Sequence, residues 1–276
     1  MMLNRGYKVM QRIYRAKNGV EEQVRFCVPK QARPRADRTR RTTPRKQEAN
    51  RNSAAHRLGR ILNNNFEQGD LFITLTYSDA AYRKLEQAVK AELPKRCTKQ
   101  KRLDAIFDAA VKEGKRFMRR LRDAGFRGGK SVLATADMDG KTGEVVRVHH
   151  HIILTGDAFS VVGKKPTLGG RLLPEIWKHG IVEWEFLRGG SYNKLAAYLI
   201  RQVRHRENRK KYTCTRNMEP VDVEEFEIFA GTTQELSAPK DAIVEERQAN
   251  AEYPTMQYLR YLCPPKPDAE KGKRRR

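Results

Sequence analysis

The sequence predicts an α+β protein in which helices pack on an antiparallel sheet. Short segments rich in β-branched and aromatic residues outnumber the long amphipathic helical segments. A glycine-containing turn, MDGKTGE at 138–144, joins two of the predicted strands directly. Antiparallel strands accept such a short connection, whereas parallel strands need a long crossover. These observations favour the α+β class over a doubly wound parallel sheet.

Four segments are expected to be strands and three to be helices. In LFITLTY, Leu71, Ile73 and Leu75 alternate with polar or aromatic neighbours, which is typical of a strand with two distinct faces. Apolar residues at spacings of three and four predict a helix over 101–124 that Gly125 can close. The predicted strands are 71–77, 131–137, 147–154 and 181–187, and the other predicted helices are a short one at LLPEIWK and one over 191–205.

Charge variation along the chain indicates three regions. Residues 1–59 are expected to be a basic N-terminal arm, because 29–60 is dense in Arg and Pro and poor in large apolar side chains. The predicted folded domain covers 60–220. Residues 221–276 are expected to be a C-terminal extension with a basic tail, either covering an edge of the sheet or forming a partner surface.

The net charge indicates a polyanionic partner. Lys and Arg number 57 against 33 acidic residues, a formal charge of +24. Neutralising phosphates releases counterions, which supplies most of the non-specific affinity for nucleic acid. Membrane surfaces are anionic too, but no apolar segment approaches the ~20 residues that span a bilayer, and the N-terminus has no secretory-signal pattern. We therefore expect a cytoplasmic protein with no membrane partner.

Three of the six histidines lie together in RVHHHIILTG at 147–156. In a strand His149 and His151 point to one face and His150 to the other. Residues two apart in a strand are separated by about 7 Å at Cα, so two imidazoles leaning together can bind one metal ion. Asp137, at the end of the neighbouring predicted strand, is the best candidate for a third ligand. A purely structural role for the histidines is the weaker alternative.

The last predicted helix offers a nucleophile. Tyr198 and Arg201 are three residues apart and adjacent on the helix surface, so a cation lies beside the phenol or the phosphate that it attacks. A neighbouring cation or metal favours the phenolate. Tyr192 is about 600° away around the helix, on a different face, so we expect a single nucleophile. Taken alone, Tyr198 has the pattern of a helix-packing aromatic residue.

Three segments in order carry a family resemblance: FITLTY, VHHHIIL and LAAYLIRQ. This order resembles the HUH family of rolling-circle replication initiators, the Rep proteins of bacterial plasmids and phages. Conjugative relaxases of the same superfamily place the tyrosine before the histidines instead. YTCTRNMEP at 212–220 is similar to a segment that closes many members, and the resemblance covers roughly residues 60–220.

The resemblance implies a ferredoxin-like or RRM-like sheet with the histidine strand at its centre. His149 and His151 would bind Mg²⁺ or Mn²⁺, with Asp137 at the position of the third ligand. Tyr198 would attack a DNA phosphate, forming a 5′-phosphotyrosine and a free 3′-OH. Arg201 stands where the family usually has Lys, which keeps the charge but places a proton-transfer role in question.

The implied partner is single-stranded or origin-hairpin DNA. Arg147 and Lys194 are expected to bind its phosphates, and Thr74 and Thr76 of the first motif to support the sheet beside the bound DNA. GFRGGKS at 125–131 lacks the first glycine of a phosphate-binding loop, so we expect a host helicase and a polymerase as partners. The alternatives are an HUH transposase or relaxase, or a non-catalytic basic module that binds DNA or RNA.

Overall fold

The chain forms two compact units, each with its own antiparallel sheet. The first unit comprises 1–41 and 219–276, and the second comprises 42–218. The α+β class and the antiparallel sheet are thereby confirmed. This computed structural model describes residues 6–31, 43–163, 165–206, 209–229, 231–232 and 234–264.

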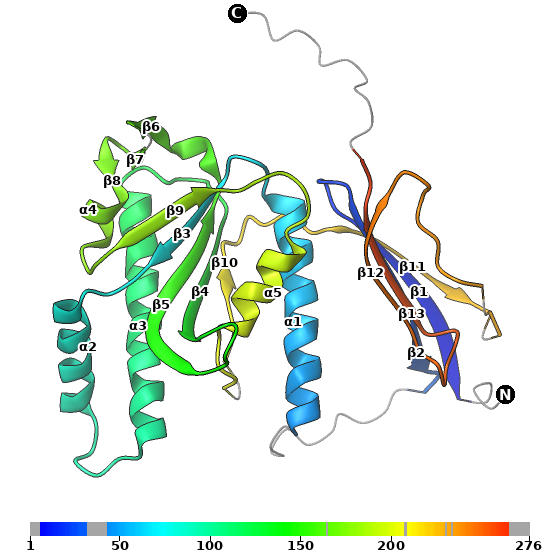
Figure 1. The fold of residues 1–276 in the computed structure, drawn as a ribbon, viewed down its shortest axis with the longest axis horizontal. Coiled ribbons are helices and arrows are strands. Elements are labelled where there is room, and N and C mark those ends of the chain that lie inside the picture. Colours follow the sequence, from blue (N-terminus) through cyan, green and yellow to red (C-terminus); the bar gives the residue numbers. More distant parts are fainter. Residues whose placement is uncertain are drawn as a thin grey trace, which may run out of the picture. The chain divides into compact units, whose positions relative to one another are not determined.

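A five-stranded sheet organises the second unit, and every neighbouring pair of its strands is antiparallel (Figure 1). In spatial order its strands are β10 (Thr213–Cys214), β4 (Ser131–Met138), β5 (Val145–Leu154), β3 (Leu71–Leu75) and β9 (Val182–Phe186). The central strand, β5, carries the three histidines. A small sheet in the same unit contains β6 (Ser160–Val162), β7 (Lys165–Leu168) and β8 (Arg171–Leu172).

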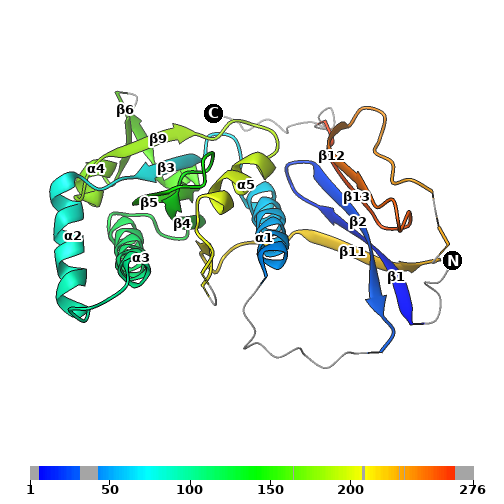
Figure 2. The ribbon, with the colours of Figure 1, turned by 60° about the horizontal axis from the view of Figure 1, so that its bottom comes forward.

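Helices cover both faces of the five-stranded sheet. They are α1 (Pro44–Asn65), α2 (Asp79–Glu92), α3 (Lys99–Asp123), α4 (Leu173–Trp177) and α5 (Asn193–Arg201), with a 3-10 turn, η1 (Gly156–Ala158). One face is covered by α3, flanked by α2 and α4, and the other by α1 and α5 (Figures 1 and 2). All four predicted strands and all three predicted helices are present, with ends shifted by a few residues.

Alternation along the strands divides the apolar side chains between two cores. Leu71, Ile73 and Leu75 pack on the α3 side with Phe117 and Trp177. The residue between the first two, Phe72, packs on the opposite side. That second core also contains Leu58 and Leu62 of α1, Val132 and Ile153 of the sheet, and Leu199 and Ile200 of α5. Both faces of the sheet are therefore buried, which fixes the direction of each side chain.

Residues 1–59 were predicted to form a basic arm, and this prediction was wrong for the part of that segment that the structure describes. Residues 44–65 form α1, which Thr43 begins by accepting a hydrogen bond from the Lys46 backbone N–H (3.3 Å). Its C-terminal half buries Leu58 and Leu62 completely. The burial of each side chain stabilises the folded state by about 2 kcal/mol. The dense Arg content hid this narrow apolar stripe. Much of the Arg-rich segment, 32–42, lies outside the described residues.

The first unit joins the two ends of the chain in one sheet. Its strands run in the spatial order β11 (Asp222–Ile228), β1 (Tyr7–Arg15), β2 (Val20–Pro29), β13 (Gln257–Leu262) and β12 (Ile243–Ala249), all antiparallel (Figure 1). The sequence predicted separate N-terminal and C-terminal regions, 1–59 and 221–276. In the structure both contribute strands to one sheet, because the region after residue 220 pairs with the N-terminal strands. The expected basic tail, from 265 onward, lies outside the described residues.

Opposite charges line the pairing between β1 and β11. The register places Arg12 opposite Glu225, and these two side chains form an ion pair. Lys8, near the start of β1, pairs with Glu227 at 2.9 Å. The acidic segment EEFEIF, which interrupts the basic trend of the sequence, is thus the strand that neutralises β1.

In the part of the chain that the structure describes, no helix has the length and apolar character needed to cross a membrane.

Candidate active site

The three histidines of β5 lie on opposite faces of the sheet. The nitrogens of His149 and His151 meet on the α5 side, where the ring of His151 stacks on Phe72 with centroids 5.5 Å apart. His150 points to the α3 side. This is the alternation predicted from the sequence.

His150 is a packed core residue. Its side chain is completely buried, and its two ring nitrogens lie 2.9 Å from the Tyr77 hydroxyl and 3.1 Å from the Thr135 hydroxyl. Burial lowers its pKa to about 3, so the ring is neutral at physiological pH. With both nitrogens engaged by hydroxyls, His150 has no nitrogen left for a metal.

His149 and His151 bring two ring nitrogens to one point. Their Nε2 atoms are 3.1 Å apart. Nδ1 of His149 donates to the carbonyl of Arg147 (3.0 Å), because a carbonyl only accepts. Nδ1 of His151 lies 3.1 Å from the hydroxyl of Thr74. Burial lowers the pKa of His151 to about 4, which keeps this ring neutral.

Gln202 completes the cluster, and the sequence analysis did not identify it. Its amide Nε2 lies 3.0 Å from Nε2 of His151, and its Oε1 lies 3.3 Å from Nε2 of His149. The backbone carbonyl of Gln202 accepts hydrogen bonds from the backbone N–H groups of Asp137 and Met138 at 3.1 and 3.0 Å. A register shift in β4 between Ala136 and Met138 frees these two groups. The sequence does contain a feature that could have identified Gln202: it follows Tyr198 by four residues and so lies on the same helical face.

The donor set fits a divalent cation. The Gln202 amide N–H donates to Nε2 of His151, which places the proton of that ring on Nδ1 and leaves a lone pair on Nε2. When both rings are in the neutral form with the proton on Nδ1, two imidazole lone pairs and an amide oxygen face one another. A shared cation satisfies all three acceptors, and imidazole with oxygen donors suits a transition metal such as Mn²⁺.

Asp137 does not join this cluster. The register pairs Ala136 with His149, so Ala136 shares the histidine face and Asp137 points to the other. Its carboxylate binds Arg206 at 2.6 Å and accepts from the Arg204 backbone N–H at 3.2 Å. Among the described residues no group of three His, Cys, Asp or Glu side chains could hold a metal. The prediction that Asp137 lies beside the two histidines was therefore wrong, and the side chain found there is that of Gln202.

Tyr198 lies beside the histidine pair. Its ring centroid is 5.5 Å from that of His151, and the residue is 40% exposed. Arg201 is the last residue of α5 and is exposed, with no ion pair or side-chain hydrogen bond to a described residue. The turn after β4 closes the cluster from one side, because a Cβ on Gly140 would be 3.2 Å from Gln202.

Tyr192 is excluded from the cluster by its burial. It precedes α5, packs in the core with α1 and is 5% exposed, and burial raises its pKa to about 12. Its backbone N–H donates to Oδ1 of Asn63 at 2.8 Å. Helix α1 approaches closely here, since a Cβ on Gly59 would be 2.3 Å from Asn193. These contacts fix the start of α5 and with it the position of Tyr198.

The remaining predicted residues surround the cluster at different depths. Thr74 contacts His151 directly, while the Thr76 hydroxyl donates to the carbonyl of Ile181 at 3.4 Å and supports the sheet edge. Arg147 is exposed and pairs with the exposed carboxylate of Asp79 at 2.7 Å. Lys194 is exposed on the first turn of α5.

Comparisons of the chain with protein-family models, with curated proteins and with solved structures found no match.

Proposed function

We propose that this protein is a metal-dependent single-strand DNA endonuclease and strand transferase of the HUH type that initiates rolling-circle replication. The observation that carries the proposal is the meeting of the His149 and His151 Nε2 atoms, 3.1 Å apart, beside an exposed tyrosine on a helix that packs against the histidine strand. The strand order with the histidines on the central strand agrees with the fold that the resemblance implies. The net charge of +24 favours a nucleic-acid substrate.

In this proposal His149, His151 and Gln202 hold Mn²⁺ or Mg²⁺. The bound ion would polarise a phosphoryl oxygen and favour attack at phosphorus. Thr74 fixes the ring of His151 through the Nδ1 contact, and Arg147 fixes His149 through its carbonyl. The protein therefore supplies an oriented pair of imidazoles before any DNA binds.

The reaction is a transesterification at one phosphodiester. The phenolic oxygen of Tyr198 attacks phosphorus and loses its proton to water, while the bond from phosphorus to the 3′ oxygen breaks and that oxygen takes a proton. The products are a 5′-phosphotyrosine and a free 3′-OH. One phosphoester is exchanged for another, so the 3′-OH can later attack the same phosphorus, release Tyr198 and rejoin the strand.

Arg201 supplies positive charge next to Tyr198. It lies three residues on, at the end of the same helix, and binds no described carboxylate, so its guanidinium is available to the phosphate. Its role in this proposal is to stabilise the phenolate and the phosphoryl oxygens through its positive charge. The free 3′-OH would serve a host polymerase as a primer, and a host helicase would unwind the duplex ahead.

A direct test is the formation of a covalent protein–DNA adduct. Purified protein is incubated with end-labelled single-stranded DNA containing hairpins, with Mn²⁺ or Mg²⁺, and denatured products are resolved by size. We expect a metal-dependent adduct that Tyr198→Phe abolishes while DNA binding persists. Tyr192→Phe, six residues away on the same chain segment, is the control and keeps the adduct. A wild-type protein that binds these DNAs and forms no adduct would support the non-catalytic binding module instead.

A further inference from the structure

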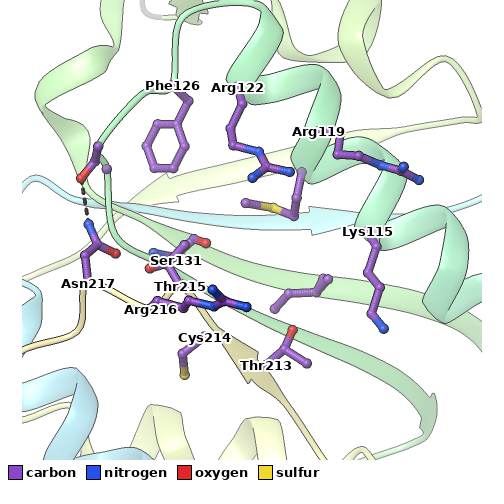
Figure 3. Close-up of a pocket in the computed structure, with 14 residues that line it drawn as sticks. Lys115, Arg119, Arg122, Phe126, Ser131, Thr213, Cys214, Thr215, Arg216 and Asn217 are labelled. Atoms are coloured by element: carbon purple, nitrogen blue, oxygen red, sulfur yellow. Dashed lines mark hydrogen bonds between the residues drawn. The ribbon is translucent and has the colours of Figure 1, made fainter.

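A pocket of about 890 Å³ lies between the C-terminal half of α3 and the edge strand β10 (Figure 3). Lys115, Arg119 and Arg122 project from α3 on one side. Thr213 and the residues that follow β10, including Arg216, form the opposite side. This volume is within the range of pockets that bind organic ligands.

The pocket concentrates uncompensated positive charge. Lys115, Arg119, Arg122 and Arg216 line it, and no carboxylate is among its lining residues. All four are exposed, and none forms an ion pair or a side-chain hydrogen bond with a described residue. Arg116, on the same helix but outside the pocket, does pair with a carboxylate.

The three cations of α3 are placed to act together. They are spaced by four and three residues, which puts them on one face of the helix. From Lys115 to Arg122 the helix rises about 10 Å. Successive phosphates of one strand can each contact one cation of such a row.

The floor of the pocket is apolar. Met118 and the buried Phe126 line it from the α3 side, and Leu133 lines it from β4. The segment after β10 is held across one end, because the side-chain amide of Asn217 donates to the carbonyl of Gly128 at 2.7 Å (Figure 3). A cationic rim over an apolar floor matches a nucleotide, whose phosphate is charged and whose base is flat and apolar on its faces.

This pocket is separate from the histidine cluster. Leu133 belongs to the core on the α3 side of the sheet, together with the face to which His150 points. His151 lies on the other side, against Phe72. A ligand in the pocket therefore lies across the sheet from Tyr198.

We propose that the pocket binds two or three nucleotides of single-stranded DNA, with backbone phosphates on Lys115, Arg119, Arg122 and Arg216 and a base over the apolar floor of the pocket. It would hold the strand at a second point away from the bond that is cut. The choice of DNA as the nucleic acid depends on the proposed function, whereas the site itself rests on the charges and the floor described above.

The test is the affinity of a fluorescently labelled 12-nucleotide DNA, measured by anisotropy against salt concentration in EDTA. The double variant Lys115→Ala/Arg119→Ala is compared with Arg102→Ala/Lys112→Ala, which removes the same two residue types from exposed positions of α3 outside the pocket. We expect the pocket variant to bind at least about tenfold more weakly and its slope of log affinity against log salt to fall by about 1.4, or 0.7 for each phosphate contact. The control variant should bind within about twofold of wild type.

Equal losses in the two variants would overturn the proposal, because they would indicate general charge rather than a site. Tight binding of dAMP that the pocket variant loses, with unchanged affinity for the 12-nucleotide DNA, would also overturn it and assign the pocket to a free nucleotide. The assay uses neither metal nor Tyr198. A protein that forms no covalent adduct but shows the expected loss would thus keep this site and lose the proposed nicking reaction.

Discussion

The Nε2 atoms of His149 and His151 lie 3.1 Å apart, with the amide of Gln202 within 3.3 Å of both. This relationship arises because strand alternation puts the two rings on one face and α5 ends against the same part of β4. His149 donates its Nδ1 proton to a carbonyl and Gln202 donates to His151, so in the neutral form of both rings two Nε2 lone pairs face each other. A cation bound between the two rings would accept both lone pairs, so metal binding at this point can be measured.

Replacing either histidine should abolish metal binding. His149→Ala or His151→Ala removes one of two nitrogen donors, and we expect Mn²⁺ affinity to fall by more than about a hundredfold, since loss of a group that only orients a ligand already costs 10- to 100-fold. Isothermal titration calorimetry with Mn²⁺ measures the effect. Wild-type affinity in either variant would refute the ligand assignment.

Gln202 should contribute as an oxygen donor. Gln202→Ala is expected to weaken Mn²⁺ binding by about tenfold, whereas Gln202→Glu retains an oxygen at the same reach and should bind at least as tightly as wild type. The same calorimetric titration compares the two. If both substitutions weaken binding equally, the amide acts only by packing between the histidine strand and α5.

Asp137 should contribute to stability and not to metal binding. Its carboxylate and the guanidinium of Arg206 are both more than nine-tenths buried and lie 2.6 Å apart. Asp137→Ala leaves a buried cation short of a partner, so we expect a loss of about 3 kcal/mol in the free energy of unfolding. Urea denaturation measures the loss. Mn²⁺ affinity under native conditions should stay unchanged, and a parallel fall in affinity would restore Asp137 as a ligand.

Acid should destabilise the protein through Glu113. Burial alone raises the pKa of this carboxyl, but hydrogen bonds from Arg116 and Arg120 and the neighbouring His179 bring the pKa below its ordinary value of 4.5. Because the folded pKa lies below the unfolded one, the stabilisation is complete above about pH 5 and is lost as pH falls through the lowered pKa. Thermal unfolding should show Glu113→Gln less stable than wild type at pH 7. The difference between the two proteins should shrink toward pH 3, and a constant difference would contradict this account.

Local patterns predicted β3, β4, β5 and β9 and the helices α3, α4 and α5, but not α1, α2 or β10 of the same unit. Alternation around Ile73 and Leu75 identified β3, and spacings of three and four identified α3, because a strand or helix buried on a defined face repeats its apolar residues at the period of its own geometry. The same alternation separated His150 from its neighbours. The partners implied by the family resemblance stay predictions.

Two predictions failed where the answer depended on contacts between distant segments. Asp137 was expected beside the histidines, but the pairing of Ala136 with His149 turns it to the other face, and neither strand encodes that register alone. Residues 1–59 were expected to form an arm, yet 7–29 pair with strands more than 190 positions later in the sequence. Such pairings are set by cross-strand charge and packing.

The sequence by itself determined the strands β3, β4, β5 and β9 and the helices α3, α4 and α5 of the second unit, the two faces of β5 and the position of Tyr198 on an amphipathic helix. Each follows from interactions within a few residues. Only the tertiary structure decided that Gln202 faces the histidines, that Arg206 pairs with Asp137, and that one pocket is lined by four cations that pair with no described carboxylate. These arrangements depend on strand register and on where α5 and β10 end against β4, because a shift of one residue turns each side chain to the opposite face.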